Sequence, residues 1–125
     1  MFRSTTGAGL ALASVGLALI ASAPPAVADA APVIHVGSDT RAKTQAECMR
    51  DANFAMRDVG LQVNLTTDIN VGGVGEINGA GVQVLVTCLS QGSRTFIEVV
   101  GASLDSSAAE QGRNRVRTVT MGAPT

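Results

Sequence analysis

The sequence has no tryptophan and no tyrosine, and phenylalanine, with three copies in 125 residues, is its only aromatic residue. Proteins that hold single-stranded nucleic acids or sugar rings commonly stack them on aromatic side chains. Neither sign of charge predominates, because the sequence has nine basic and ten acidic residues. Without a basic surplus the chain has little to attract a polyanion. We therefore expect no nucleic acid among its partners.

Histidine occurs once, at His35, and cysteine only twice. A tetrahedral zinc site needs four ligands, and these three residues are scattered along the chain. His35 could titrate near neutral pH, but no second histidine and no marked nucleophile accompany it. The other acid–base candidates are Asp39 and Asp68 or Glu76, and no pattern brings them together. We expect no catalytic residue, no metal and no cofactor.

The N-terminus has the features of a secretory signal peptide. Arg3 is the only charge before Asp29, and a Gly/Ala/Leu-rich run precedes two prolines and the small-residue stretch around Ala28. This order of charged, apolar and A-x-A regions is typical of cleaved export signals. We expect residues 1–28 to be removed, with cleavage after Ala30 as the alternative. An uncleaved anchor is disfavoured because the apolar run is short for a membrane span. After cleavage no integral membrane segment is expected.

About 95 residues remain, which is the size of one small domain. The two cysteines of an exported chain most simply form one disulfide, here between Cys48 and Cys88. Closing a loop of this length would stabilise the fold by about 4 kcal/mol. A domain this small gains much from such a cross-link.

Two helices are expected. Residues 44–59 begin with a T-x-x-E capping box at Thr44 and end before Gly60. Residues 103–117 form the second helix, capped by Asp105 or Ser107, with residues 118–125 frayed. Apolar or small residues recur at helical spacing in both. In the first helix they are Cys48, Ala52, Ala55, Met56 and Val59, and in the second Ala109, Gly112 and Val116. Arg113, Arg115 and Arg117 suit a solvated helix end, with an anionic docking face as the alternative.

Three strands are expected at residues 61–69, 82–90 and 95–102, because apolar residues alternate there and turn residues separate them. Residues 29–43 are compatible with a short fourth strand at an edge, followed by a turn at residues 37–39. Residues 82–90 carry Cys88 and form the strongest strand pattern. Their valines share the face with Cys88, whereas Leu85 and Leu89 lie on the other face. We expect that mixed face to be covered by the second helix or to be a contact surface.

Glycine is frequent between residues 70 and 81. Gly75 to Gly81 read G-x-x-x-G-x-G, which resembles the phosphate loop of dinucleotide-binding enzymes. That loop must lead into a helix, whereas here a strand follows. The segment is therefore interpreted as a hairpin loop, with Asn78-Gly79 forming a type I′ turn.

A cysteine-bearing helix, three strands with a cysteine in the middle one and a C-terminal helix together resemble small exported bacterial proteins of unknown function. The residues that carry this resemblance are Cys48, Ala52, Ala55, Gly60, Cys88, Glu98 to Gly101 and the helix that follows. The resemblance implies a fold and an export route, and no activity comes with it.

The sequence thus predicts a small α+β domain at residues 44–117: an antiparallel sheet of three or four strands with two helices packed on it, in the order (β)-α-β-β-β-α, and one disulfide. The function expected is a non-enzymatic module of the cell envelope or extracellular space. It would bind another protein or a small ligand through the face with Leu85 and Leu89. The alternative is a small extracytoplasmic enzyme or enzyme inhibitor. The pattern indicates no oligomeric state.

Overall fold

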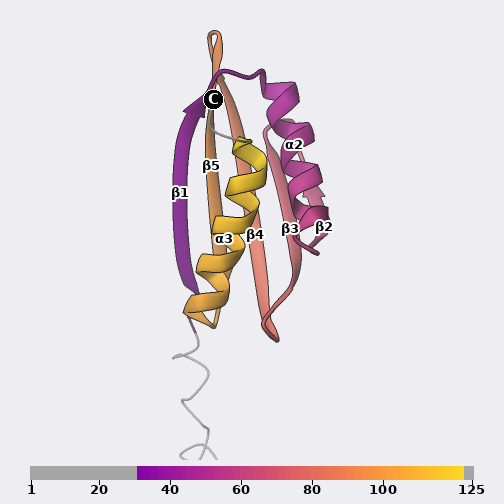
Figure 1. Cartoon of the computed structure of the whole chain (residues 1–125), viewed down its shortest axis with the longest axis vertical. Coiled ribbons are helices and arrows are strands. Elements are labelled where there is room, and N and C mark those ends of the chain that lie inside the picture. Colours follow the sequence, from indigo (N-terminus) through magenta and orange to yellow (C-terminus); the bar gives the residue numbers. More distant parts are fainter. Residues whose placement is uncertain (1–30, 123–125) are drawn as a thin grey trace, which may run out of the picture. The chain divides into compact units, whose positions relative to one another are not determined.

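Five antiparallel strands form one sheet, and two helices pack on the same face of it (Figure 1). The computed structural model describes residues 31–122. The predicted signal peptide, residues 29–30 and residues 123–125 lie outside this range. The α+β class, the antiparallel sheet, the two helices and the disulfide are as predicted. The sheet has five strands, however, rather than three or four.

The strands are β1 (Val33–Arg41), β2 (Gln62–Thr66), β3 (Asn70–Ile77), β4 (Ala80–Gln91) and β5 (Arg94–Ser103), and the helices are α2 (Gln45–Asp58) and α3 (Ser106–Met121). Their order across the sheet is β1-β5-β4-β3-β2. Strands β2 to β5 therefore form a meander, and β1 pairs with the last of them. Helix α2 carries the chain from one edge of the sheet to the other, and β4 is the central strand.

Helix α2 begins and ends as its sequence predicts. Thr44 is the N-cap, and its hydroxyl accepts a hydrogen bond from the Glu47 amide at 3.1 Å. At the other end the Leu61 amide donates to the Met56 carbonyl and the Gly60 amide donates to the Arg57 carbonyl. With Gly60 at a φ of 88°, this is a Schellman stop. The predicted stripe is buried, apart from Val59, which is partly buried.

Helix α3 packs closely on β4 and β5 because its contact face has small residues. Asp105 is the N-cap and accepts from the Ala108 amide at 2.8 Å, so Asp105 and not Ser107 begins the helix. A Cβ placed on Gly101 of β5 would collide with the carbonyl oxygen of Ala109. A strand glycine therefore sets how near the helix backbone can come to the sheet.

The end of α3 differs from the prediction. The helix does not stop near Arg117 but continues to Met121, and both Thr120 and Met121 are buried. Lys43, which precedes α2, donates from Nζ to the Thr120 carbonyl at 2.7 Å. This bond satisfies one of the carbonyl groups that a helix C-terminus leaves without a partner. Residues 118–121 are thus ordered by a contact with a segment distant in sequence.

Strand β3 occupies the segment that the glycines had suggested to be a loop. Only Asn78 and Gly79, with φ of 54° and 79°, form the turn to β4, as a type I′ hairpin requires. Gly73 and Gly75 face α2: a Cβ on Gly73 would lie 2.7 Å from Met56 Sδ, and one on Gly75 would lie 2.9 Å from Leu61 Cδ2. These glycines leave space for the side chains of Met56 in α2 and of Leu61, which follows the helix, and they do not break the strand.

The edge strands also differ from their patterns. Strand β1 runs straight through residues 37–39, where a turn was expected, and pairs with β5 over its full length. In β2 a register shift between Val63 and Leu65 interrupts the alternation. A β-bulge inserts a residue and so moves the following side chains to the opposite face. Val63 therefore packs against the core, whereas Leu65 is on the opposite face and 45% exposed.

The core lies between the sheet and the helices. Strands β4 and β5 contribute the central residues, and Met56, Val116 and Met121 close the core from the helix side. The main strand residues of this core are Val71, Ile77, Val82, Val84, Val86, Cys88, Ile97 and Val99. All of the predicted valines with Cys88 are among them. The other face of the sheet consequently contributes nothing to this core.

Candidate functional site

Both helices cover one face of the sheet, and no element among residues 31–122 covers the other (Figure 1). We call the uncovered surface the open face. It consists of the strand side chains that alternate with those of the core. These are Ile34, Val36, Ser38 and Thr40 of β1, Gln62 and Leu65 of β2, Asn70, Gly72, Val74 and Glu76 of β3, Gln83, Leu85, Thr87, Leu89 and Gln91 of β4, and Arg94, Phe96, Glu98, Val100 and Ala102 of β5.

An apolar row crosses the open face from one edge of the sheet to the other. Val36 of β1 pairs with Val100 of β5, which in turn lies opposite Leu85 of β4. Leu85 then pairs with Gly72 of β3, and Gly72 pairs with Leu65 of β2. Side chains that are directly opposite on one face of a sheet are in contact distance. The row is thus continuous over all five strands, and the side chains of Leu65 and Asn64 lie over Gly72.

The neighbouring row makes the apolar area wider. Ile34 pairs with Ala102, which pairs with Gln83, which pairs with Val74, which pairs with Gln62, so that three of the five residues are apolar. Ile34 and Val36 are 59% and 53% exposed. Large apolar side chains exposed side by side on a small protein mark a contact surface more often than isolated ones do. At this end the open face is slightly hollowed, with Pro32 and Leu104 beside Val74 and Ala102.

A polar row crosses the open face next to the apolar one. It contains Ser38, Glu98, Thr87 and Asn70, one from each of four neighbouring strands. The Thr87 hydroxyl donates to Asn70 Oδ1 at 2.7 Å. Glu98, half-buried, is the one ionisable group in this row. Any surface that covers the open face must therefore supply a donor to this carboxylate, because an unpaired buried charge is costly.

Leu85 and Leu89, the residues predicted for an interaction face, both lie on the open face. Leu85 is half-buried in the apolar row, and Leu89 is 39% exposed beside Phe96 at the other end of the strand. Thr87 separates the two in the polar row. The second helix does not cover them, because α3 packs on the opposite face. The sequence pattern missed Val36, Val100 and Leu65, whose common row depends on the pairing register and on the bulge in β2.

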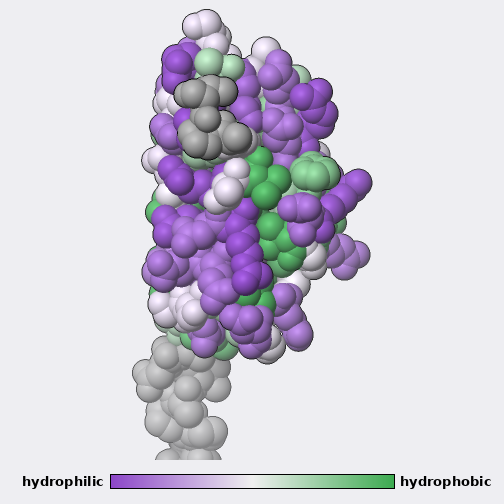
Figure 2. Space-filling view, in the orientation of Figure 1, coloured by the Kyte–Doolittle hydropathy of each residue, from purple (hydrophilic) through white to green (hydrophobic). Residues whose placement is uncertain are grey.

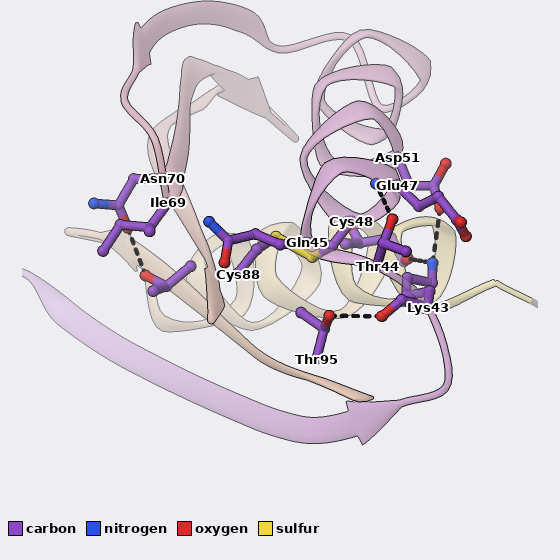
Figure 3. Close-up of a disulfide and its surroundings, with 12 residues drawn as sticks. Lys43, Thr44, Gln45, Glu47, Cys48, Asp51, Ile69, Asn70, Cys88 and Thr95 are labelled. Atoms are coloured by element: carbon purple, nitrogen blue, oxygen red, sulfur yellow. Dashed lines mark hydrogen bonds and ion pairs between the residues drawn. A yellow bond between two sulfur atoms is a disulfide. The ribbon is translucent and has the colours of Figure 1, made fainter. Parts of the chain in front are cut away.

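The predicted disulfide joins α2 to β4 beneath this surface (Figure 3). The sulfur atoms of Cys48 and Cys88 are 2.02 Å apart, and both residues are fully buried. Gln45 lies alongside and bridges two segments: its Nε2 donates to the Asp68 carbonyl and its Oε1 accepts from the Ser90 amide, each at 3.1 Å. Burial keeps thiols away from external reductants and metals, so this disulfide serves the fold.

The candidates for acid–base chemistry are not brought together. His35 and Asp39 are on the helix-covered side of β1 but four residues apart, which is about 13 Å along a strand. Asp39 is 3.3 Å from Arg41 Nη2. Asp68 lies in the β2–β3 turn and Glu76 near the end of β3. Within residues 31–122 no group of three or more histidine, cysteine or acidic side chains is arranged to hold a metal ion.

The one contact suggestive of catalysis involves a residue that the sequence did not single out. His35 Nε2 lies 3.2 Å from the hydroxyl oxygen of Ser106, at the first position of α3. A histidine beside a serine hydroxyl is the base–nucleophile pair of many hydrolases. This pair is solvent-exposed, and among the described residues the only hydrogen bond of the His35 ring is this one. No signal short of the fold places positions 35 and 106 together.

The helix-covered side of the molecule is mainly hydrophilic, with apolar side chains exposed along the seam between α2 and α3 (Figure 2). A shallow groove in this seam has Val59 and Val119 as its apolar part and Asp58 and Arg115 among its polar residues. Arg115 is bonded to the Gln111 side chain at 2.8 Å. The three arginines predicted as a possible docking face are thus divided, since Arg113 bonds to β1 instead.

The glycine motif at residues 75–81 lies in the β3–β4 hairpin and is followed by strand β4. In the described part of the chain, neither helix is long and apolar enough to cross a membrane. Comparison with protein-family models and with curated proteins gives no match to this chain.

Proposed function

We propose that this protein is an exported, non-enzymatic interaction module that docks onto a protein surface through the open face of its sheet. The observation that carries the proposal is the apolar row of Val36, Val100, Leu85, Gly72 and Leu65, which spans all five strands and is left uncovered. Proteins seldom leave such an area in water unless it has a partner.

The shape of the open face supports a protein partner more than a small ligand. Sites for small molecules are concave and enclose most of their ligand. The open face is a broad sheet surface with only a shallow hollow near Val74 and Ala102. A face of this type fits the flat, apolar-centred and polar-edged surfaces of protein complexes. The partner must also provide a donor for Glu98.

Export to the cell envelope or the extracellular space is supported by the signal peptide predicted at residues 1–28 and is compatible with the buried disulfide. We also propose that this protein is related to the small exported bacterial proteins that its sequence resembles.

Photocrosslinking tests the docking surface. A benzoyl-phenylalanine replaces Leu85 in the open face or, as a control, Phe54 on α2, which is an apolar residue 62% exposed on the other side of the molecule. We expect irradiation of the exported protein in its own cell fraction to give discrete adducts from position 85 and none from position 54. The proposal is wrong if position 85 gives no adduct, or if both positions give the same ones.

The alternative, a small extracytoplasmic enzyme, is favoured only by the contact between His35 and Ser106. A serine activated by histidine reacts with fluorophosphonates. Labelling of the wild-type protein that disappears in both His35→Ala and Ser106→Ala would support this alternative. We expect no labelling, because the pair is exposed to solvent and, among the described residues, no second hydrogen bond orients the His35 ring.

A further inference from the structure

We infer that the protein docked on the open face is a second copy of this chain, related to the first by a twofold axis that runs along β4. This inference rests on the proposed function, because it names the occupant of the same surface. It starts from the topology: β4 is the central strand, with β5 and β1 on one side and β3 and β2 on the other. An axis along β4 therefore exchanges β5 with β3, and β1 with β2.

Under this symmetry the apolar row becomes complementary to itself. Val100 of one copy lies opposite Gly72 of the second, where it meets the apolar side chain of Leu65 that lies over the glycine. Val36 lies opposite Leu65 of the second copy, and Leu85 lies on the axis and meets its own equivalent. An isologous interface requires this kind of self-matching surface.

The polar row decides the direction of the axis. With the axis along β4, the Glu98 carboxylate lies opposite Asn70 of the second copy, because both belong to the same row on opposite sides of Thr87. Asn70 Oδ1 already accepts from Thr87, so its amide hydrogens can serve as the donors to that carboxylate. With the axis along the apolar row instead, Glu98 would lie opposite Ala102 and would be buried without a partner.

The available area is sufficient. Five strands spaced about 4.8 Å apart, with four outward-facing rows separated by about 6.8 Å, give a footprint of roughly 650 Å² per copy. Two such faces bury about 1,300 Å² in total, which is within the range of specific interfaces and near its lower end. The strands of two sheets packed face to face cross at about 30°. This rotation displaces residues on the edge strands more than residues next to the axis. The pairs of Val100 with Gly72 and of Glu98 with Asn70 are therefore displaced least.

Sedimentation velocity over a range of protein concentrations measures the association. We expect the exported, disulfide-bonded protein to sediment as a dimer at high concentration and to dissociate on dilution. Leu85→Arg places two like charges at the axis and should raise the dissociation constant at least about 100-fold. Phe54→Arg, on the helix-covered side, should leave the constant unchanged. Far-UV circular dichroism and urea unfolding of each variant show that the fold is retained.

A charge-exchange experiment tests the register. Asn70→Asp alone should raise the dissociation constant of the dimer about 10-fold or more. The new carboxylate at position 70 of each copy then faces the Glu98 carboxylate of the other copy, and the two repel. An equimolar mixture of Asn70→Asp with Glu98→Lys should form a heterodimer about as stable as the wild-type dimer, because lysine and aspartate then face one another. A wild-type protein that is monomeric at every concentration would overturn the inference, as would a mixture that does not recover.

The inference and the proposed function can fail separately. If the wild type is monomeric but position 85 crosslinks to a different protein, the second copy is the wrong occupant and the docking surface stands. If the wild type is monomeric and position 85 gives no adduct, both are wrong. An adduct from position 85 with twice the mass of the chain, lost in Asn70→Asp, supports both.

Discussion

Arg113 of α3 donates a hydrogen bond from Nη1 to the carbonyl oxygen of Val36 in β1 at 3.0 Å, although 77 residues separate the two in sequence. The guanidinium group reaches this carbonyl by passing over Gly37, where a Cβ would lie 3.0 Å from Nη1. Thr40, four residues along the same strand, accepts at its carbonyl from Arg94 Nη2 at 3.1 Å. Two arginines thus occupy backbone acceptors of the edge strand.

Removing the bond between Arg113 and the Val36 carbonyl should expose the β1 edge of the sheet to pairing with other strands. Arg113→Met retains the aliphatic length but leaves the Val36 carbonyl free for another strand, and free edges promote aggregation. We expect faster growth of light scattering and thioflavin fluorescence on mild heating. Arg115→Met, which removes only a bond to the Gln111 side chain, serves as the control. Equal aggregation rates for the two variants would show that Arg113 does not protect the edge.

Gly101→Ala should be among the most damaging single-methyl additions. Its Cβ would overlap the Ala109 carbonyl oxygen, and the backbone of a helix packed on the sheet has no free volume into which it can move. We expect a loss of about 3 kcal/mol in the free energy of unfolding, measured in urea. In Gly81→Ala the new Cβ meets no atom within 4 Å, so this variant should be neutral or stabilised by up to about 1 kcal/mol. Similar losses for both variants would contradict the close approach of α3.

Loss of the disulfide should destabilise the fold without changing it. The Cys48→Ala/Cys88→Ala double variant removes a cross-link across 40 residues, which lowers the free energy of unfolding by about 4 kcal/mol through unfolded-state entropy. Urea denaturation with and without dithiothreitol measures the effect. Reductant should destabilise the wild type and leave the double variant unaffected. Reduced and oxidised wild type with equal midpoints would refute a stabilising role.

Lys43 should stabilise the last turn of α3. Its Nζ contacts Asp51 Oδ2 and the Thr120 carbonyl, each at 2.7 Å, and its side chain is 13% exposed. Lys43→Met should cost about 2 kcal/mol and accelerate amide hydrogen exchange near Met121. Arg50 contacts the same Asp51 at 3.8 Å with a side chain 74% exposed, and exposed pairs contribute little. Arg50→Met should change stability by less than about 0.5 kcal/mol, and a larger loss there would contradict this assignment.

Local chemistry made much of the fold predictable. The start and end of α2 depend on Thr44, Glu47 and Gly60, whose capping interactions involve neighbours within a few residues. The hairpin at Asn78-Gly79 depends on two residues that tolerate positive φ. Cys48 and Cys88 were the only candidates for a disulfide, so their pairing needed no knowledge of the topology.

Strand β3 could not be recognised in the same way. Its glycines have low strand propensity, and what offsets this is the space that they leave for Met56 and Leu61 of the α2 region. Likewise the pattern of β2 predicted one face for Val63 and Leu65, whereas the bulge places them on opposite faces. In β3 a contact with residues outside the strand offsets the low local preference, and in β2 a bulge in the pairing with β3 overrides the alternation.

By itself, the sequence determined the two helices, the strands with regular alternation, the covalent link between Cys48 and Cys88 and the position of Leu85 and Leu89 on the face away from that link. Only the tertiary structure decided that this face is open, that it extends over five strands and that Val36, Val100 and Leu65 share a row with Leu85. The physical reason is the range of the forces involved. Capping, turn geometry and alternation act within a few residues, whereas the register of β1 against β5 pairs residues 54 to 70 positions apart and the bond from α3 to β1 joins residues 77 positions apart.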